Sequence, residues 1–205
     1  MYSARPDMTA GTDTQLILWL ASAAAIPIAG AVGGVLWWRA TAATREVERT
    51  LRGIAQDAVR GVVVPDGLDG PIYIECVLVG ARALVVLDLR DVRGAVFGAE
   101  KMDEWTVLDG VKRFTFRNPL VSLHDRVNAL RHHLGDEVEV EGRIVFSSRA
   151  SFPKGIPPRA VALRGLAVDL AEALGAADAP LVPAVEAVWP RLTALGTSTR
   201  VKPRR

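Results

Sequence analysis

Residues 72–90 read IYIECVLVGARALVVLDLR, and the arrangement of the central sheet depends on them. The stretch contains two apolar runs, Ile72–Val79 and Ala83–Leu89, which are rich in β-branched side chains. Runs of this length and composition are typical of strands, and a short connection between them is typical of an antiparallel hairpin. We therefore predict two neighbouring strands that turn at Ala81-Arg82.

The register of this hairpin places charged side chains together. If Gly80 lies opposite Ala83, the numbers of paired residues add up to 163, so Glu75 faces Asp88 and Tyr73 faces Arg90. Because side chains alternate between the two faces of a strand, one face is wholly apolar and is expected to meet the core. That face carries Ile72, Ile74, Cys76, Leu78, Val85, Leu87 and Leu89. The other face carries Tyr73, Glu75, Val77, Val86, Asp88 and Arg90.

Two carboxylates that face each other across a hairpin repel, so their charge requires compensation. One interpretation is a divalent cation, because Mg²⁺ binds one or two carboxylates together with waters and phosphate oxygens. Glu75 and Asp88 would then be metal ligands at a site for phosphoryl transfer. The other interpretation is an ion network in which Arg90, diagonal to Glu75, neutralises the pair. The spacing alone leaves both interpretations open.

The segments on either side predict an α/β domain with a mixed sheet flanked by helices. Further strands are expected at Val62–Val64, Gly94–Gly98, Trp105–Leu108, Val111–Phe116, Val138–Phe146 and Ala160–Leu163, with those directly after the hairpin continuing the same sheet. Helices are expected over 40–59, from Asn118-Pro119 to Gly135, over Leu166–Leu174 and over Leu181–Leu195, the last kinked or broken at Pro190.

The N-terminal part has the composition of a membrane anchor. Leu16–Trp38 is a run of 23 residues without a charge, and a helix of that length spans a hydrocarbon core of roughly 30 Å. Tryptophans near both ends suit the two interfaces. A cleaved signal peptide has a basic start and a shorter apolar run, so we predict an uncleaved single-pass helix in the lipid bilayer.

The basic residues around this span predict its orientation. Only Arg5 precedes the span, whereas four arginines follow it closely: Arg39, Arg45, Arg49 and Arg52. The positive-inside rule therefore predicts an N-terminus outside the cell membrane and a cytoplasmic C-terminal domain. Gly30 and Gly34 form a GxxxG step, which is either a dimerisation face or a feature of a span rich in small residues.

The amino-acid composition argues against several kinds of binding site. The chain has 205 residues and a net charge of +2, and its basic excess is concentrated in the tail at Arg200, Lys202, Arg204 and Arg205. Net charge therefore does not indicate a nucleic-acid-binding face. The single cysteine, Cys76, excludes an internal disulfide and a multi-cysteine zinc site.

These observations together predict how the chain is divided. We expect an extracytoplasmic segment (1–15), the span (16–38), a juxtamembrane helix (39–60), one domain (61–176), a C-terminal helix (177–196) and a basic tail (197–205).

Three consecutive motifs resemble the core of the nuclease-related domain (NERD) family: Ile74–Gly80, Leu84–Arg90 and Gly94–Gly98. In that family a strand of the form I-D-H-hydrophobic-G precedes one that ends in E-x-K, and a G-x-hydrophobic-x-G step follows. Trp105 and Asn118-Pro119-Leu120 stand where the family has a Trp and an N-P-L helix start. The resemblance covers about 46–174 and implies the restriction-endonuclease-like fold of PD-(D/E)xK nucleases, in which acidic residues bind Mg²⁺ for phosphodiester cleavage.

The sequence departs from the family pattern at positions that the resemblance implies belong to the catalytic site. Glu75 stands in place of Asp, Cys76 in place of His, and Asp88-Leu89-Arg90 in place of E-x-K. Ser122 replaces a common Gln, and either Glu48 or Asp57 could supply the acid that usually precedes the strands. A methylene added to or removed from a carboxylate moves a metal ligand well beyond coordination tolerance, and Arg, unlike Lys, stays protonated.

These departures leave two functional hypotheses. The first is a catalytically degenerate, membrane-anchored binding or scaffold module, in which the charged residues form a structural network. The second is a weak Mg²⁺-dependent nuclease acting on nucleic acid, in which Glu75 and Asp88 bind the metal and Arg90 contacts the phosphate.

Overall fold

The computed structural model describes residues 46–65 and 70–198, which belong to one compact unit that begins at Glu46. The predicted membrane span, its flanking N-terminus and the end of the basic tail lie outside these residues. Among the helices that the structure does describe, none combines the length and the apolar character that crossing a membrane requires.

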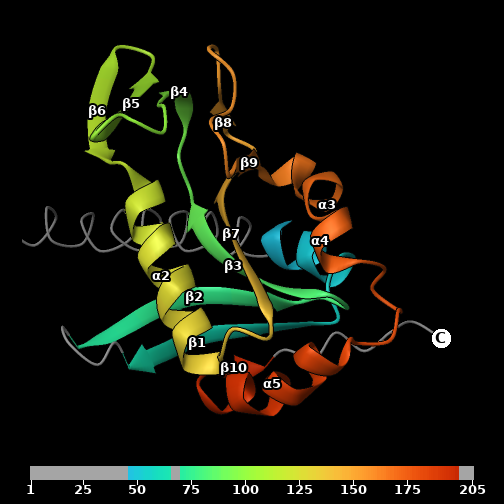
Figure 1. The fold of residues 1–205 in the computed structure, drawn as a ribbon. Coiled ribbons are helices and arrows are strands. Elements are labelled where there is room, and N and C mark those ends of the chain that lie inside the picture. Colours follow the sequence, from blue (N-terminus) through green and yellow to red (C-terminus); the bar gives the residue numbers. More distant parts are fainter. Residues whose placement is uncertain (1–45, 66–69, 199–205) are drawn as a thin grey trace, which may run out of the picture. The chain divides into compact units, whose positions relative to one another are not determined.

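The central sheet has six strands in the order β10-β1-β2-β3-β7-β9 (Figure 1). Its bounds are β1 (Asp57–Pro65), β2 (Pro71–Val79), β3 (Ala83–Arg90), β7 (Glu139–Phe146), β9 (Ala160–Ala162) and β10 (Thr197–Ser198). β1, β2 and β3 form an antiparallel meander, whereas β7 runs parallel to β3 and β9 runs parallel to β7. The sheet is therefore mixed, as predicted.

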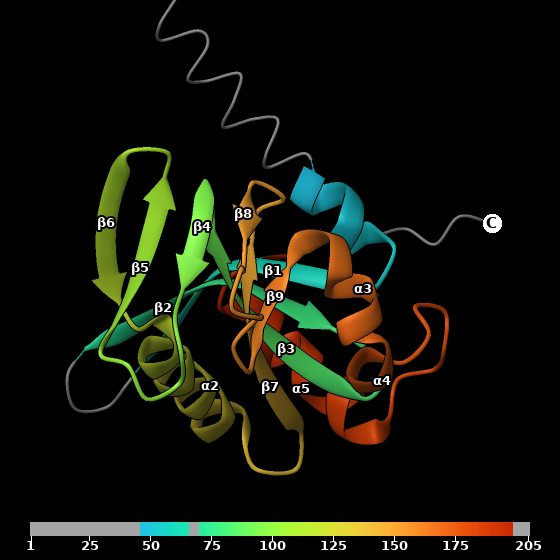
Figure 2. The same ribbon diagram turned by 90° about the horizontal axis from the view of Figure 1, so that it is seen from above.

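A second sheet of four strands, in the order β6-β5-β4-β8, lies beside the first (Figure 2). It comprises β4 (Gly94–Phe97), β5 (Glu104–Asp109), β6 (Lys112–Arg117) and β8 (Ala150–Ser151). The prediction that the strands after the hairpin continue the central sheet is therefore wrong, although their positions are confirmed. Two glycines allow β4 and the residues after it to pack closely against β5. A Cβ at Gly94 would lie 2.3 Å from the carbonyl oxygen of Leu108, and a Cβ at Gly98 would lie 2.2 Å from the Trp105 ring.

Helices cover both faces of the central sheet. A helix over 46–52 precedes β1, and α2 (Pro119–Leu134) connects β6 to β7. The others are η1 (Leu163–Gly165), α3 (Leu166–Asp169), α4 (Ala171–Leu174) and α5 (Pro183–Ala194). α2 begins as predicted, because the Asn118 side chain accepts a hydrogen bond from the Leu120 N–H and Pro119 occupies the first turn.

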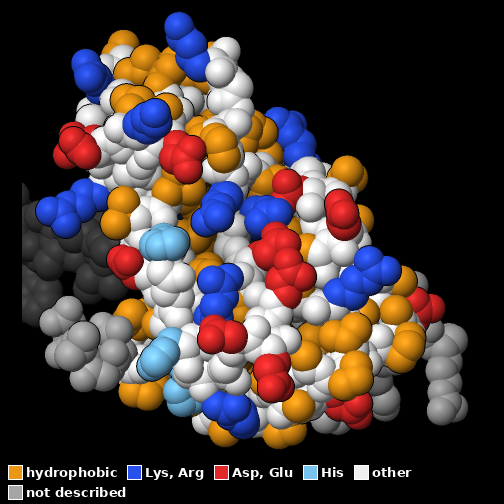
Figure 3. Space-filling model, in the orientation of Figure 1, with side chains coloured by type: hydrophobic (Ala, Val, Ile, Leu, Met, Phe, Trp, Pro, Cys, Tyr) orange, Lys and Arg blue, Asp and Glu red, His pale blue; other side chains and the backbone are white. Residues whose placement is uncertain are grey.

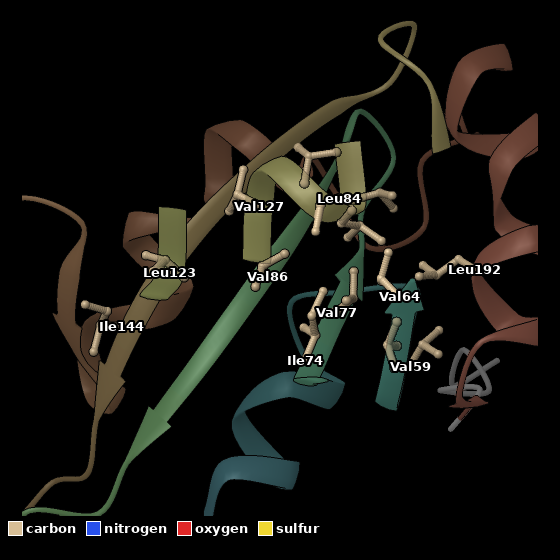
Figure 4. Packing of buried hydrophobic residues seen from close by; sticks show 14 of the residues in the cluster. Val59, Val64, Ile74, Val77, Leu84, Val86, Leu123, Val127, Ile144 and Leu192 are labelled. Carbon is tan, nitrogen blue, oxygen red and sulfur yellow. The ribbon is translucent and has the colours of Figure 1, made fainter. Parts of the chain in front are cut away.

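The buried residues form two clusters, one on each face of the sheet. The larger cluster joins α2 and α5 to β1, β2 and β3, and Figure 4 shows Leu123 and Val127 of α2 beside Val86. The smaller cluster packs the helix over 46–52, α3 and α4 against the other face. Trp105 of the second sheet stacks on Phe146 of β7 with ring centroids 6.0 Å apart, so the two sheets share the larger cluster.

The alternation of side chains predicted for β2 is interrupted at Glu75. Cys76 and Leu78 lie in the smaller cluster as predicted, but Ile74 packs in the larger cluster with Val77. The expectation that Ile72 and Ile74 share a face with Cys76 is therefore wrong. In the β1–β2 ladder, Arg60 pairs with Cys76 and Val62 pairs with Ile74. Gly61 and Glu75 lie between these pairs and therefore stand opposite each other. Gly61 has φ +61°, a left-handed conformation that lets both strands change faces here.

Other expectations also need correction. The juxtamembrane helix predicted over 39–60 is described as a helix only over 46–52. The segment that follows is a strand from Asp57, because the valines of β1, Val59 and Val62–Val64, favour a strand over a helix. The helix predicted over Leu166–Leu174 consists of two short helices that meet at Leu170. Of the two outcomes expected at Pro190, a kink or a break, the break is wrong, because α5 continues through Pro190 to Ala194.

Candidate functional site

Asp88 is the centre of the candidate site. It lies near the C-terminal end of β3, where alternation turns it toward α2, and only 7% of its surface is exposed. Its Oδ2 accepts two hydrogen bonds from guanidinium groups, one from Arg90 Nη2 at 2.8 Å and one from Arg126 Nη1 at 2.9 Å. A buried carboxylate is costly unless it is paired, and these two ion pairs supply the compensation.

Arg126 connects three elements around this carboxylate. From α2 it binds Asp88 on β3, its Nε donates to the carbonyl oxygen of Tyr73 on β2 at 3.1 Å, and its Nη1 lies 3.4 Å from Ser122 Oγ. Arg126 was not among the site residues predicted from the sequence. Its position in the sequence nevertheless indicated a buried-side residue. Arg126 comes three residues after Leu123 and four before Leu130, and residues at these spacings lie on the same side of a helix.

Glu75 lies next to Asp88 at the point where β2 changes faces. The predicted register is confirmed through the pair Cys76–Leu87, whose numbers add up to 163. One residue further, Glu75 Oε2 accepts a long hydrogen bond of 3.4 Å from the backbone N–H of Leu89. Partial burial raises the pKa of the Glu75 carboxyl, and the charge of Asp88 raises it further, whereas the Leu89 N–H, Arg60 and Arg90 oppose this rise.

Positive charge exceeds negative charge at this site. Arg60, Arg90 and Arg126 surround two carboxylates, and the Nε of Arg90 is buried without a hydrogen-bond partner. A divalent cation would have to compete with two guanidinium groups for the buried oxygen of Asp88. As arranged, the donor set does not fit Mg²⁺, which prefers carboxylates that are free to coordinate it. Within residues 46–65 and 70–198, no three His, Cys, Asp or Glu side chains are grouped closely enough to hold a metal ion.

Neither upstream acid considered in the sequence joins the pair. Asp57 is fully buried in β1, where its Oδ2 accepts a hydrogen bond from Trp189 Nε1 at 3.0 Å. It is paired in register with Val79, at the end of β2 remote from Glu75. Glu48 lies on the helix over 46–52, which packs on the face opposite α2, and forms an ion pair with Arg52 at 3.6 Å. The structure thus brings together Glu75, Asp88 and Arg90, and adds Arg126.

Comparison with protein families supports the resemblance seen in the motifs. Residues 39–147, more than half of the chain, match the family described as Nuclease-related domain. A search of curated proteins and a search of solved structures found no match. The matched region includes β1, β2, β3, the β4–β6 strands and α2, and therefore every residue of the candidate site.

Proposed function

Because the chain belongs to the nuclease-related domain family, we propose that it is a membrane-anchored member in which the nuclease-like site has become part of a binding or scaffold module. The observation that carries this proposal is the pair of guanidinium groups on Asp88 Oδ2. In a metal-dependent site this oxygen would be available to a cation. Here Arg90 and Arg126 hold it, so the carboxylate stabilises the junction of β2, β3 and α2.

We also propose that the core is of the restriction-endonuclease type. The order of elements supports this proposal, since a helix, an antiparallel meander of β1, β2 and β3, the helix α2 and the parallel strand β7 follow one another. The second sheet is inserted between β3 and α2 and is joined by β8, which follows β7. In this arrangement Glu75 and Asp88 come from adjacent central strands, as the family pattern implies.

Titration of Mn²⁺, as a substitute for Mg²⁺, into the full chain in detergent micelles tests the proposal. We expect no saturable binding to the wild type, and we expect Asp88→Asn to lower the free energy of unfolding by about 2 kcal/mol. The reason is that the variant leaves two guanidinium groups beside a neutral amide, although their partial exposure reduces the cost. Denaturant unfolding of both proteins measures this difference.

Asp91→Asn is the matched control. Asp91 is also an ion-paired aspartate, with Arg149, but both side chains are substantially exposed. Its substitution should therefore cost less than about 1 kcal/mol. Saturable Mn²⁺ binding that Asp88→Asn abolishes and Asp91→Asn retains would contradict the proposal and would favour the alternative, a weak Mg²⁺-dependent nuclease.

A further inference from the structure

The β5–β6 hairpin ends in an exposed apolar turn. Its last pair is Asp109–Lys112, and the two residues between them are Gly110, with φ +61°, and Val111. Val111 is fully exposed, at 103% of its reference surface. Within three residue pairs of the turn, Leu108 and Phe114 are also exposed. Three large apolar side chains are thus presented to solvent at one end of the second sheet.

The same end of the hairpin carries positive charge. Lys112 and Arg113 are exposed and, among the residues that the structure describes, no carboxylate lies within 4.0 Å of either cation. The nearby Asp109 is already paired with Arg93 at 3.4 Å. Figure 3 shows basic and hydrophobic side chains next to each other over this end of the molecule.

The base of the hairpin is held firmly, so the turn projects from a fixed support. Trp105 is fully buried, contacts the Phe116 ring at 6.2 Å between centroids and donates a hydrogen bond to the Ala99 carbonyl. Three residue pairs of an antiparallel ladder span about 10 Å, which matches the roughly 5–10 Å to which amphipathic elements enter the lipid headgroup region.

We propose that the turn formed by Leu108–Phe114, with Lys112 and Arg113, docks onto the surface of an anionic lipid bilayer. The cations would bind lipid phosphates while Val111 and Phe114 enter the headgroup layer. Positive residues on an edge strand also prevent edge-to-edge pairing, but that role does not need a fully exposed valine at the turn. A nucleic acid fits less well, because the most exposed side chain, Val111 at the tip, is aliphatic and offers no surface for base stacking, which leaves Phe114 as the single aromatic ring of the turn.

A fluorescent label at the tip tests this proposal on the full chain. Val111→Cys introduces a unique reactive thiol, because the native Cys76 is fully buried. The control label is placed at Val168→Cys on α3, where the replaced valine is 84% exposed. The labelled proteins are reconstituted with vesicles of phosphatidylcholine, with or without phosphatidylglycerol, that contain a nitroxide-quencher lipid. We expect quenching at residue 111 that requires phosphatidylglycerol, and much weaker quenching at residue 168.

Removing the tip cations should reverse this effect. Each Lys or Arg near an anionic membrane contributes about a fivefold factor to binding, so Lys112→Gln with Arg113→Gln should weaken docking about twenty-five-fold. The matched control is Arg82→Gln with Arg164→Gln, which removes two exposed cations elsewhere and should leave quenching unchanged. Equal quenching at residues 111 and 168, or quenching that survives loss of Lys112 and Arg113, would overturn the proposal. So would a label that responds to a single-stranded oligonucleotide and not to the vesicles.

Discussion

At Asp88, one buried carboxylate oxygen accepts hydrogen bonds from two arginines that approach from different elements. Arg90 stands at the position where the motif resemblance implies Lys, and this difference has a physical consequence. A lysine ammonium is a compact charge that can lose its proton, whereas a guanidinium stays protonated and forms directed hydrogen bonds. The substitution therefore favours a fixed ion pair with Asp88 over proton transfer at this position.

Glu75 provides a residue-scale prediction about pH. Its pKa is raised, chiefly by partial burial, so the folded protein holds this proton more tightly than the unfolded chain. Glu75 therefore opposes folding progressively as the pH rises through about 4.3, the ordinary value for a glutamate, and beyond it. Because the Glu75 side chain is also exposed, solvent screens this effect, and we expect Glu75→Gln to be only slightly more stable than the wild type at pH 7, with the difference shrinking toward pH 4. Urea unfolding at both pH values measures it.

Glu172→Gln is the control for this experiment, since Glu172 is an exposed glutamate in α4 and has no part in the site. Its difference from the wild type should be small at both pH values. If the wild type were more stable than Glu75→Gln at pH 7, the Leu89 N–H, Arg60 and Arg90 together would outweigh the partial burial of the Glu75 carboxyl, contrary to the expected order of these effects.

The sequence predicted some residues of the candidate site but not all of them. Glu75, Asp88 and Arg90 belong to one hairpin, and the apolar alternation predicted its register correctly as far as the pair Cys76–Leu87, next to Glu75 and Asp88. Arg126 is 38 residues from Asp88, and its contact depends on how α2 crosses the sheet. No local pattern encodes that crossing, although the buried-side position of Arg126 in the helix indicated that it needs a partner.

At the scale of elements, the strands and α2 were predictable because each has its own periodicity and boundary residues. The change of faces in β1 and β2 was not predicted, since the alternation in β2 reads as continuous and the cause lies on the neighbouring strand at Gly61. The two-residue strands β8 and β10 are too short to carry a pattern. Their formation depends on neighbours that folding brings alongside them.

Asn118 gives a prediction at this scale, because one side chain joins α2 to the loop before β5. Its oxygen caps the helix at the Leu120 N–H, and its Nδ2 donates to the carbonyls of Glu100 at 2.9 Å and Met102 at 2.8 Å. We expect Asn118→Ala to lower the free energy of unfolding by about 2–3 kcal/mol. Loss of the cap contributes about 1 kcal/mol, and the carbonyls left without a donor contribute the rest.

Asn118→Ser separates these two contributions. Serine retains an oxygen that can cap the helix but cannot replace both amide donors, so its cost should fall between those of the wild type and Asn118→Ala. Denaturant unfolding of the three proteins measures the order. Equal costs for Ser and Ala would show that the cap contributes nothing and that the link to the loop carries the whole effect.

At the scale of the whole molecule, the two sheets act as one body because Trp105 and Phe146 stack across their junction. The sequence predicted the strands of both sheets but assigned them to one, because strand periodicity does not specify which strands become neighbours. The turn that separates the sheets lies at Gly94, where φ is +116° and the backbone of Leu108 approaches closely. Only the folded arrangement reveals that close approach.

The membrane topology is the whole-molecule prediction. Four arginines follow the apolar segment Leu16–Trp38 and one precedes it, so we expect the N-terminus outside the cell and the domain inside. Single cysteines at Ser3→Cys and Val168→Cys report the two sides, because the buried Cys76 does not compete for the reagent. A membrane-impermeant maleimide should label residue 3 in intact cells, and residue 168 only after the cells are permeabilised.

Each other labelling pattern has a distinct physical meaning. Labelling of residue 168 in intact cells, with residue 3 protected, would mean that the charge asymmetry does not set the orientation of this span. Recovery of the unlabelled chain in the soluble fraction after lysis would mean that residues 16–38 do not anchor it, and would remove the membrane from the proposed function. The ion pairs on Asp88 do not depend on either outcome, because every group that forms them lies within the folded domain.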